Sequence, residues 1–352
     1  MSREFRVGDR VIGTGAPAFL VAEAGVNHNG DPDLARRLVV ESAGIGADAV
    51  KFQTFRAADL VTREAPKAAY QRETTGGGGG QREMLAGLEL PPAAFAALRD
   101  ESVRRGIVFF SSPFDEASAD ALESLDVALF KIPSGEITNL AFLRHVAAKG
   151  RPIILSTGMS TLEEIATAVG AIRSAGDPPL ALLQCVSAYP APAEETNLRA
   201  MDTLRERFGC VVGLSDHTTG IEVAIAAVAR GAAIIEKHFT VDKSLPGPDH
   251  RASLDPGEFA ALVRGVRRVE AALGDGDKRP MPSEADTRRV ARKSLVAARP
   301  IGRGEKITRE MIVVKRPGTG ISPADLERAI GRTAARPLAA DEVIDWAALE
   351  GA

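Results

Sequence analysis

Two histidines of this chain follow short apolar runs in similar contexts. His217 ends the segment GLSDH, and His238 ends the segment IIEKH. If the two runs are neighbouring barrel strands, both imidazoles can reach one divalent cation and leave its other positions to water and substrate. Neither spacing matches a structural zinc motif, so we expect a catalytic ion, with Mn²⁺ before Mg²⁺ or Co²⁺. The alternative is that these two histidines, of the five in the chain, have a structural role and bind no metal.

Lysine and hydroxyl side chains recur at the ends of other apolar runs. The lysines are Lys51 and Lys131, and the hydroxyl residues at comparable positions are Ser112, Ser134, Ser156, Ser187 and Ser215. Lysine charges with hydroxyl groups around them suit a phosphate and a carboxylate. Any one serine could instead cap a helix, and a lysine could flank a strand for solubility. The whole set on one rim favours an anion site.

Three carboxylates, Glu23, Glu136 and Asp249, fall in segments that would meet at the same rim. Carboxylates can grip sugar hydroxyls and can also carry out an acid–base step. The sequence alone does not distinguish these roles from that of a surface charge.

The elements that must position these residues alternate over residues 19–272. The apolar runs predicted as strands are 19–23, 49–53, 107–111, 129–132, 153–156, 180–184, 211–214 and 233–237, and predicted helices include 32–45, 92–105, 117–125, 162–175 and 221–230. Eight strands alternating with helices predict a (β/α)₈ TIM barrel, with a doubly wound open sheet as the alternative. Polar residues at nearly every strand end favour the barrel, because its strand ends converge on one mouth.

The chain is expected to contain two domains. Residues 1–274 would form the barrel, residues 275–292 a linker, and residues 293–352 a small domain that is near the lower size limit for independent stability. Within the barrel, the run of five glycines from Gly76 to Gly80 is expected to be a mobile loop at the mouth.

Composition narrows the class of protein. The chain has 352 residues and a net charge of −3, from 44 Lys and Arg against 47 Asp and Glu, so no basic field exists to bind nucleic acid. Its two cysteines have no short metal-type spacing and fit a reducing cytoplasm. No signal peptide and no membrane-spanning run is apparent. We therefore expect a cytoplasmic enzyme.

Taken together, several segments resemble the N-acetylneuraminate (sialic acid) synthase family, which includes N,N′-diacetyllegionaminate synthases. These segments are AEAGVNHNG (22–30), ADAVKFQT (47–54), FFSSPFD (109–115), FKIPSGEITN (130–139), PIILSTGMS (152–160), QCVSAYPAP (184–192), GLSDHT (213–218), IEKHFTVDKSLPGPDHRASL (235–254) and VKRPGTGIS (314–322). The resemblance covers nearly the whole chain, and its C-terminal part resembles an antifreeze-like (SAF, β-clip) domain.

The resemblance implies a condensation of phosphoenolpyruvate, N-acetylmannosamine and water to N-acetylneuraminate and phosphate, with C–O cleavage. It implies that His217 and His238 bind the metal and that Gln53 lies close to the metal and water. It makes Glu136 the best candidate for the proton-handling carboxylate. The residues that match phosphoenolpyruvate contacts are Lys51, Lys131, Ser112, Ser134, Ser156, Ser187 and Ser215, and those that match sugar contacts are Glu23, Tyr189, His238 and Asp249.

The resemblance also implies a domain-swapped homodimer, because Arg316 matches an arginine that the antifreeze-like domain of one subunit inserts into the partner's barrel. Two departures concern the sugar. The family's sugar-binding asparagine has no clear counterpart in residues 73–81, and Ser187 stands where some members have asparagine. These departures leave the contacts to the sugar's acyl groups open. The segments PGPD (246–249) and SGE (134–136) favour the neuraminate or legionaminate branch over the pseudaminate branch. An N,N′-diacetyllegionaminate synthase that uses 2,4-diacetamido-2,4,6-trideoxymannose is the alternative.

Two further alternatives come from other classes of protein. A Schiff-base aldolase would use Lys51 or Lys131 as its nucleophile, would need no metal and would require a desolvated lysine. A catalytically silent binding protein would use only its antifreeze-like domain. The two histidines and the hydroxyl residues argue against both.

Overall fold

The computed structural model describes residues 4–351, which form two compact units divided between Gly274 and Asp275. The terminal bounds predicted at residues 1 and 352 lie outside the described residues. None of the helices in the described range combines the length and the apolar character needed to cross a membrane.

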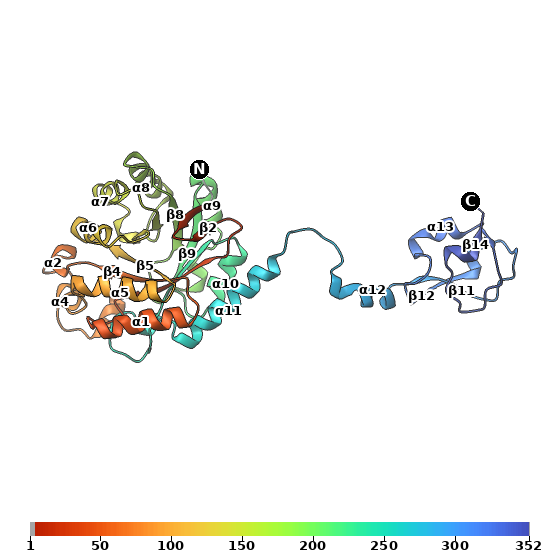
Figure 1. The fold of residues 1–352 in the computed structure, drawn as a ribbon, viewed down its shortest axis with the longest axis horizontal. Helices are drawn as coiled ribbons and strands as arrows, with labels where there is room; N and C mark the ends of the chain where they lie inside the picture. The colour runs from red at the N-terminus through yellow and green to blue at the C-terminus, as the bar shows by residue number, and fades with distance from the viewer. Residues whose placement is uncertain (1–3, 352) are drawn as a thin grey trace. The chain divides into compact units, whose positions relative to one another are not determined.

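The first unit is a barrel of parallel strands, as predicted (Figure 1). Within the described range its eight strands are β3 (Phe19–Gly25), β4 (Ala49–Thr54), β5 (Val108–Pro113), β6 (Phe130–Ile132), β7 (Ile153–Ser156), β8 (Leu180–Cys185), β9 (Val211–Asp216) and β10 (Ile234–His238). They are hydrogen-bonded in the order β5-β4-β3-β10-β9-β8-β7-β6. The two end strands, β5 and β6, also lie side by side, so the sheet curls into a nearly closed barrel and not an open sheet.

Helices cover the outside of the strands (Figure 1). They are α1 (Pro32–Gly44), α5 (Pro92–Arg104), α6 (Glu116–Ser124), α7 (Leu140–Ala147), α8 (Leu162–Ser174), α9 (Ala200–Phe208), α10 (Glu222–Ala229) and α11 (Pro256–Leu273). Local signals set several boundaries: Thr161 and Glu164 form a capping box at α8, and Asp31 caps α1 directly before a proline. A large apolar cluster fills the space between these helices and the strands.

An N-terminal hairpin closes the inside of the barrel, and it was not predicted. Strands β1 (Glu4–Val7) and β2 (Arg10–Gly13) pair antiparallel. Phe5, Val7 and Ile12 are buried in one apolar cluster with inward-facing residues of the barrel strands. The charges of Glu4 and Arg6 alternate with these apolar residues and remain exposed, as expected for a strand with one buried face.

The segment after β4 contains three short helices in the described range, where only a mobile glycine loop was predicted. They are α2 (Ala57–Leu60), α3 (Ala69–Thr75) and α4 (Gln81–Ala86). The glycine run joins α3 to α4, and buried Lys67 holds it. The Lys67 Nζ donates to the carbonyl oxygens of Gly76 at 3.2 Å and Gly78 at 2.7 Å and to the Thr75 hydroxyl at 3.2 Å.

The second unit has its own apolar core of buried residues. Its described elements are α12 (Ala285–Ala291), β11 (Ser294–Ala297), β12 (Ile312–Lys315), α13 (Leu326–Ala329), β13 (Thr333–Ala334) and β14 (Leu349–Glu350). Strand β11 pairs antiparallel with β12, and β13 with β14. A 3₁₀ turn, Pro323–Asp325, leads directly into α13.

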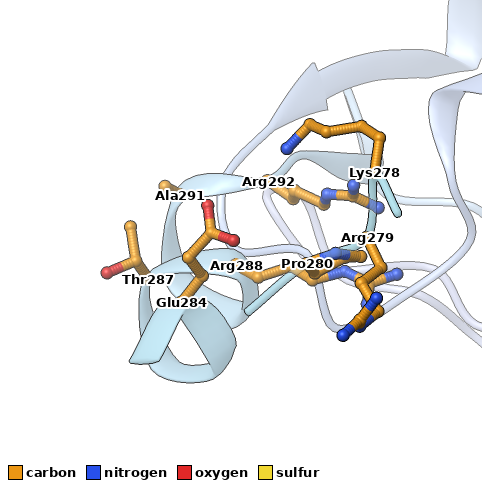
Figure 2. Close-up of a pocket in the computed structure, with 8 residues that line it drawn as sticks. All are labelled: Lys278, Arg279, Pro280, Glu284, Thr287, Arg288, Ala291 and Arg292. Atoms are coloured by element: carbon orange, nitrogen blue, oxygen red, sulfur yellow. The ribbon is translucent and has the colours of Figure 1, made fainter. Parts of the chain in front are cut away.

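The segment predicted as a linker is partly helical, since it includes α12. Asp286 in the first turn and Arg288 and Arg289 in the last turn suit the helix dipole. Beside this helix lies a cavity of about 460 Å³ (Figure 2). Its lining residues are Lys278, Arg279, Pro280, Glu284, Thr287, Arg288, Ala291 and Arg292. Four of these residues are basic and one is acidic, and Arg279 is paired with Asp275 and Asp277.

Candidate active site

A cavity of about 410 Å³ opens at the carboxyl ends of the barrel strands. Most of the predicted site residues line it: Glu23, Lys51, Gln53, Ser112, Lys131, Ser134, Ser156, Ser187, Tyr189, Ser215, His217 and His238. The strand period of two explains this gathering, because it turns Lys51 and Gln53, or Glu236 and His238, to the same side of the sheet. Geometry alone does not assign the roles of these residues.

The floor of the cavity is a buried cluster of four charged side chains. The Lys51 ammonium lies 2.8 Å from Glu23 Oε2 and 3.7 Å from Glu236 Oε2, and the Lys131 ammonium lies 3.6 Å from Glu236 Oε1. Hydroxyl groups complete the cluster: Lys51 donates to Ser112 at 3.2 Å, and Ser215 donates to Glu236 at 3.0 Å. Each side chain of the quartet is at most 6% exposed.

Burial and mutual attraction oppose each other in this cluster. Burial raises the pKa of Glu23 to about 7, although Lys51 acts against it. Burial lowers the pKa of Lys131, and Glu236 only partly offsets this effect. For Lys51 the balance is reversed, because Glu23 and Glu236 outweigh burial and raise its pKa. The cluster is therefore a desolvated set of two amino and two carboxyl groups, in which an incoming anion interacts strongly with the lysines.

The two predicted metal ligands lie together above this cluster, with ring centroids 5.4 Å apart. The His217 Nδ1 lies 2.7 Å from the Val186 carbonyl oxygen. A carbonyl only accepts, so Nδ1 carries a proton, and in the neutral ring Nε2 then keeps its lone pair. The Nδ1 of His238 is buried and has no hydrogen-bond partner among the described residues. These features fit a cation, since a ligating imidazole usually donates its other N–H to an oriented acceptor.

Within the described chain, no group of three or more histidine, cysteine or carboxylate side chains is arranged to hold a metal. A cation bound by His217 and His238 would therefore take its other ligands from water and substrate, which is the open arrangement of a catalytic site.

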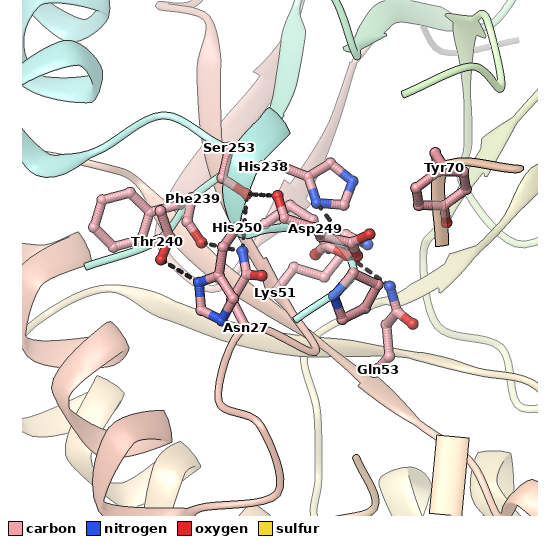
Figure 3. Close-up of polar contacts among 12 residues, drawn as sticks. Asn27, Lys51, Gln53, Tyr70, His238, Phe239, Thr240, Asp249, His250 and Ser253 are labelled. Carbon is pink, nitrogen blue, oxygen red and sulfur yellow. Dashed lines mark hydrogen bonds and ion pairs between the residues drawn. The ribbon is translucent and has the colours of Figure 1, made fainter. Parts of the chain in front are cut away.

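Asp249 is buried beside the cavity without lining it, and its Oδ2 lies 3.9 Å from His238 Nδ1. Figure 3 shows the polar contacts that hold its segment. The Ser253 hydroxyl donates to the Asp249 carbonyl at 2.7 Å. The Asn27 amide donates to Ser253 Oγ at 2.8 Å and to the Phe239 carbonyl at 2.9 Å. Asn27, which was not predicted, thus ties the residue after His238 to the segment that carries Asp249.

Besides Asp249, two predicted residues are not brought into the cavity lining. Glu136 ends the 3₁₀ turn Ser134–Glu136, and its carboxylate accepts from Asn139 Nδ2 at 2.8 Å. Arg316 belongs to the second unit, where it is exposed directly after β12. The roles implied for both residues stay predictions.

The cavity lining also contains residues that the sequence did not single out as site residues: Tyr70, Gln81, Phe114, Pro133, Gly135, Met159, Cys185 and Glu236. The position of Glu236, two residues before His238 on one strand face, could have revealed it. Tyr70 and Gln81 come from the segment after β4, which has no strand-end signal. Tyr70 stacks on Tyr189 at 5.0 Å between centroids, and Tyr189 stacks on His217 at 4.2 Å.

Comparison with known proteins identifies the family. The NeuB family model matches residues 38–278, and a SAF domain model matches residues 292–350. The chain belongs to the NeuB family. It is 45% identical to the N,N′-diacetyllegionaminic acid synthase of Legionella pneumophila, over 97% of this chain and 98% of that protein. It is 36% identical to the human N-acetylneuraminate-9-phosphate synthase, over 95% of this chain and 93% of that protein.

A solved NeuB-type structure agrees with this assignment. The N-acetylneuraminic acid (sialic acid) synthetase of Leptospira borgpetersenii, crystallised in complex with citrate, is 36% identical and superposes with a TM-score of 0.73. The match covers 82% of this chain and 95% of that one. The predicted family, barrel, SAF domain and enzyme class are therefore confirmed: this NeuB chain is a synthase of the sialic, legionaminic and pseudaminic acid group.

Proposed function

We propose that this NeuB enzyme condenses phosphoenolpyruvate and water with 2,4-diacetamido-2,4,6-trideoxymannose, giving N,N′-diacetyllegionaminate and phosphate. The observation that carries the condensation is the buried Glu23–Lys51–Glu236–Lys131 cluster beneath two imidazoles at one barrel mouth. The choice of sugar is supported by the 45% identity to a diacetyllegionaminate synthase, against 36% to a neuraminate-9-phosphate synthase. N-acetylmannosamine, the first expectation from sequence, becomes the second candidate.

The lysines and hydroxyl groups of the cavity floor hold phosphoenolpyruvate in this proposal. The Lys51 and Lys131 ammonium groups neutralise the phosphate and the carboxylate, and Ser112, Ser156 and Ser215 fix their orientation. His217 and His238 hold a divalent cation, Mn²⁺ before Mg²⁺ or Co²⁺, which supplies Lewis-acid polarisation of the sugar aldehyde.

The chemistry balances without a further reactant. The C3 carbon of phosphoenolpyruvate bonds to the aldehyde carbon, and the aldehyde oxygen takes up a proton to become a hydroxyl. A water oxygen adds to C2 and gives up a proton. The bond between C2 and the bridging oxygen then breaks. Phosphate leaves with the bridging oxygen and takes up the second proton of the water, whose oxygen remains as the keto oxygen.

Several residues have proposed supporting roles. Gln53 and Glu23 face the reacting atoms together, because the Gln53 amide donates to Glu23 at 3.2 Å. Glu136 follows Ser134 and Gly135, two residues that line the cavity, so its proton-handling role requires a rotation of its side chain away from Asn139. Arg316 would reach the barrel of a second subunit in a domain-swapped homodimer, as the family resemblance implies.

The test uses purified full-length protein with phosphoenolpyruvate labelled with ¹⁸O at the bridging position. We expect labelled phosphate and a diacetyllegionaminate product with the diacetamido sugar, slower turnover with N-acetylmannosamine, loss of turnover in EDTA and recovery with Mn²⁺. Faster turnover of N-acetylmannosamine would reverse the order of the two sugars. A lysine adduct trapped by borohydride with pyruvate would favour the Schiff-base aldolase, and no turnover with either sugar would overturn the proposal.

A further inference from the structure

The α3–α4 segment forms one wall of the cavity through two side chains, Tyr70 and Gln81. This wall is fixed at several points. Lys67 donates two hydrogen bonds to the connecting glycine run and one to the Thr75 hydroxyl, and the Gln81 backbone N–H donates to the Ala65 carbonyl at 3.0 Å. The Thr74 hydroxyl, which lies 2.9 Å from the Tyr70 carbonyl oxygen, also lies 3.3 Å from the Pro248 carbonyl oxygen, next to Asp249. Tyr70 and Gln81 are therefore presented by a braced wall.

The hydrogen bonds of this wall fix which atoms of Tyr70 and Gln81 remain for a ligand. The Ala68 backbone N–H lies 2.9 Å from the buried side chain of Gln71. A backbone N–H can only donate, so the Gln71 atom that it meets is the carbonyl oxygen, Oε1. The same oxygen lies 3.3 Å from the Gln81 side chain, which must therefore present its amino group, Nε2, to it.

The same reasoning orients the tyrosine. The Gln71 oxygen is assigned, so Gln71 Nε2 is the atom that lies 3.4 Å from the Tyr70 hydroxyl, and it donates to that oxygen. The Tyr70 O–H proton is then left to donate elsewhere. The Gln81 Oε1 has no hydrogen-bond partner among the described residues and is left to accept. The contacts with Gln71 thus leave one donor, the Tyr70 O–H, and one acceptor, the Gln81 Oε1, on the wall.

We propose that Tyr70 and Gln81 form a subsite for an acetamido group of the sugar, with Tyr70 donating to its carbonyl oxygen and Gln81 accepting from its N–H. This inference rests on the proposed function, since it assumes an acetamido-sugar aldehyde at the imidazoles. An acetamido group carries one donor and one acceptor, which is the complement of this pair. A hydroxyl group also donates and accepts, but through a single oxygen, whereas an acetamido group presents its N–H and its carbonyl oxygen at separate atoms.

The position of the wall selects the acetamido group at C4 rather than the one at C2. The aldehyde carbon, C1, must lie at His217 and His238. The Tyr189 ring packs against Tyr70 on one side and against His217 on the other, so Tyr70 is one ring further from the imidazoles. The C2 substituent is bonded next to the aldehyde carbon, whereas the C4 substituent is two carbons further along the chain. The C4 acetamido group therefore reaches the wall.

The experiment compares two sugars with the full-length enzyme. One is 2,4-diacetamido-2,4,6-trideoxymannose, and the other is 2-acetamido-2,6-dideoxymannose, which has a hydroxyl at C4. The variants are Tyr70→Phe, which removes only the hydroxyl, and Gln81→Met, which keeps the chain length without the amide. Glu83→Gln, on the exposed side of α4, is the matched control.

We expect each test variant to lower kcat/KM for the diacetamido sugar about tenfold, as for one lost hydrogen bond in a buried site. With the C4-hydroxyl sugar the loss should stay within about twofold, and KM for phosphoenolpyruvate and the control variant should be unchanged. Equal losses with both sugars would overturn the subsite, because they would reveal a structural role or a contact at C2. Absence of turnover by the unmodified enzyme would instead refute the proposed function, so the two failures are distinguishable.

Discussion

His28 offers a quantitative test of how the loops around the barrel mouth respond to acid. Its side chain is 1% exposed and packs on Phe52, with ring centroids 6.1 Å apart. Its Nδ1 accepts a hydrogen bond from the Gly30 backbone N–H at 3.0 Å, so the ring is held in its neutral form. Burial lowers the pKa of His28 to about 4 from an ordinary value of 6.5, although Asp31 acts in the opposite direction.

The sign and size of the effect follow from linkage. The unfolded chain binds a proton at His28 below pH 6.5, whereas the folded chain does so only near pH 4, so acid favours unfolding between these values. The stability contribution is present above about pH 6.5 and is lost progressively as the pH falls to the folded pKa. Between pH 7 and pH 5, His28 alone should reduce the free energy of unfolding by about 2 kcal/mol, and the full loss below pH 4 should be about 3 kcal/mol.

The assay is urea unfolding followed by circular dichroism at pH 7 and pH 5, with His28→Asn as the variant. The asparagine oxygen can still accept from Gly30, but the side chain cannot be protonated. The variant should be less stable at pH 7, because it loses the ring contact with Phe52, yet its decrease between pH 7 and pH 5 should be smaller by about 2 kcal/mol. If the free energy of unfolding of His28→Asn fell as much between pH 7 and pH 5 as that of the unmodified protein, protonation of His28 would not be the cause.

Three other predictions concern the cavity and its walls. Asn27→Ala removes two buried hydrogen bonds, and we expect it to reduce the free energy of unfolding by about 2–4 kcal/mol in urea titrations; a loss below about 1 kcal/mol would contradict the bracing role. Lys67→Met should increase hydrogen exchange of the amides in residues 76–80, measured by mass spectrometry, and unchanged exchange would mean that the glycine run is held by other contacts. Arg316→Ala should raise KM for the sugar by about tenfold or more while KM for phosphoenolpyruvate changes less than about twofold, and equal effects in steady-state kinetics would count against a sugar contact from the SAF domain.

The site residues that lie on strands could be predicted from the sequence. Side chains alternate between the two faces of a strand, and this alternation depends only on neighbouring positions in the sequence. An apolar run followed by polar residues already states which side chains share a face. This is why the barrel, and the gathering of Lys51, Lys131, Ser215, His217 and His238 at one mouth, could be predicted. Family motifs added Tyr189 and Gln53 to the same cavity.

Loop-borne features could not be predicted in this way. Tyr70 and Gln81 lie in a segment whose glycines carry no periodic signal, and their positions depend on Lys67 and Gln71 bonding across the turn. The orientation of Glu136 toward Asn139 is likewise a local choice of rotamer that no pattern encodes.

The sequence by itself determined which polar residues stand at the end of each barrel strand. It also determined the family and the expected division of the chain into two domains. Only the tertiary structure decided that Glu236 lies between two lysines from different strands, and that Asn27 joins the Phe239 carbonyl to Ser253. Contacts of this kind depend on the stagger of strands and loops that are up to 226 residues apart in the chain. That stagger is set by packing of the whole barrel, because closure fixes every strand relative to all the others.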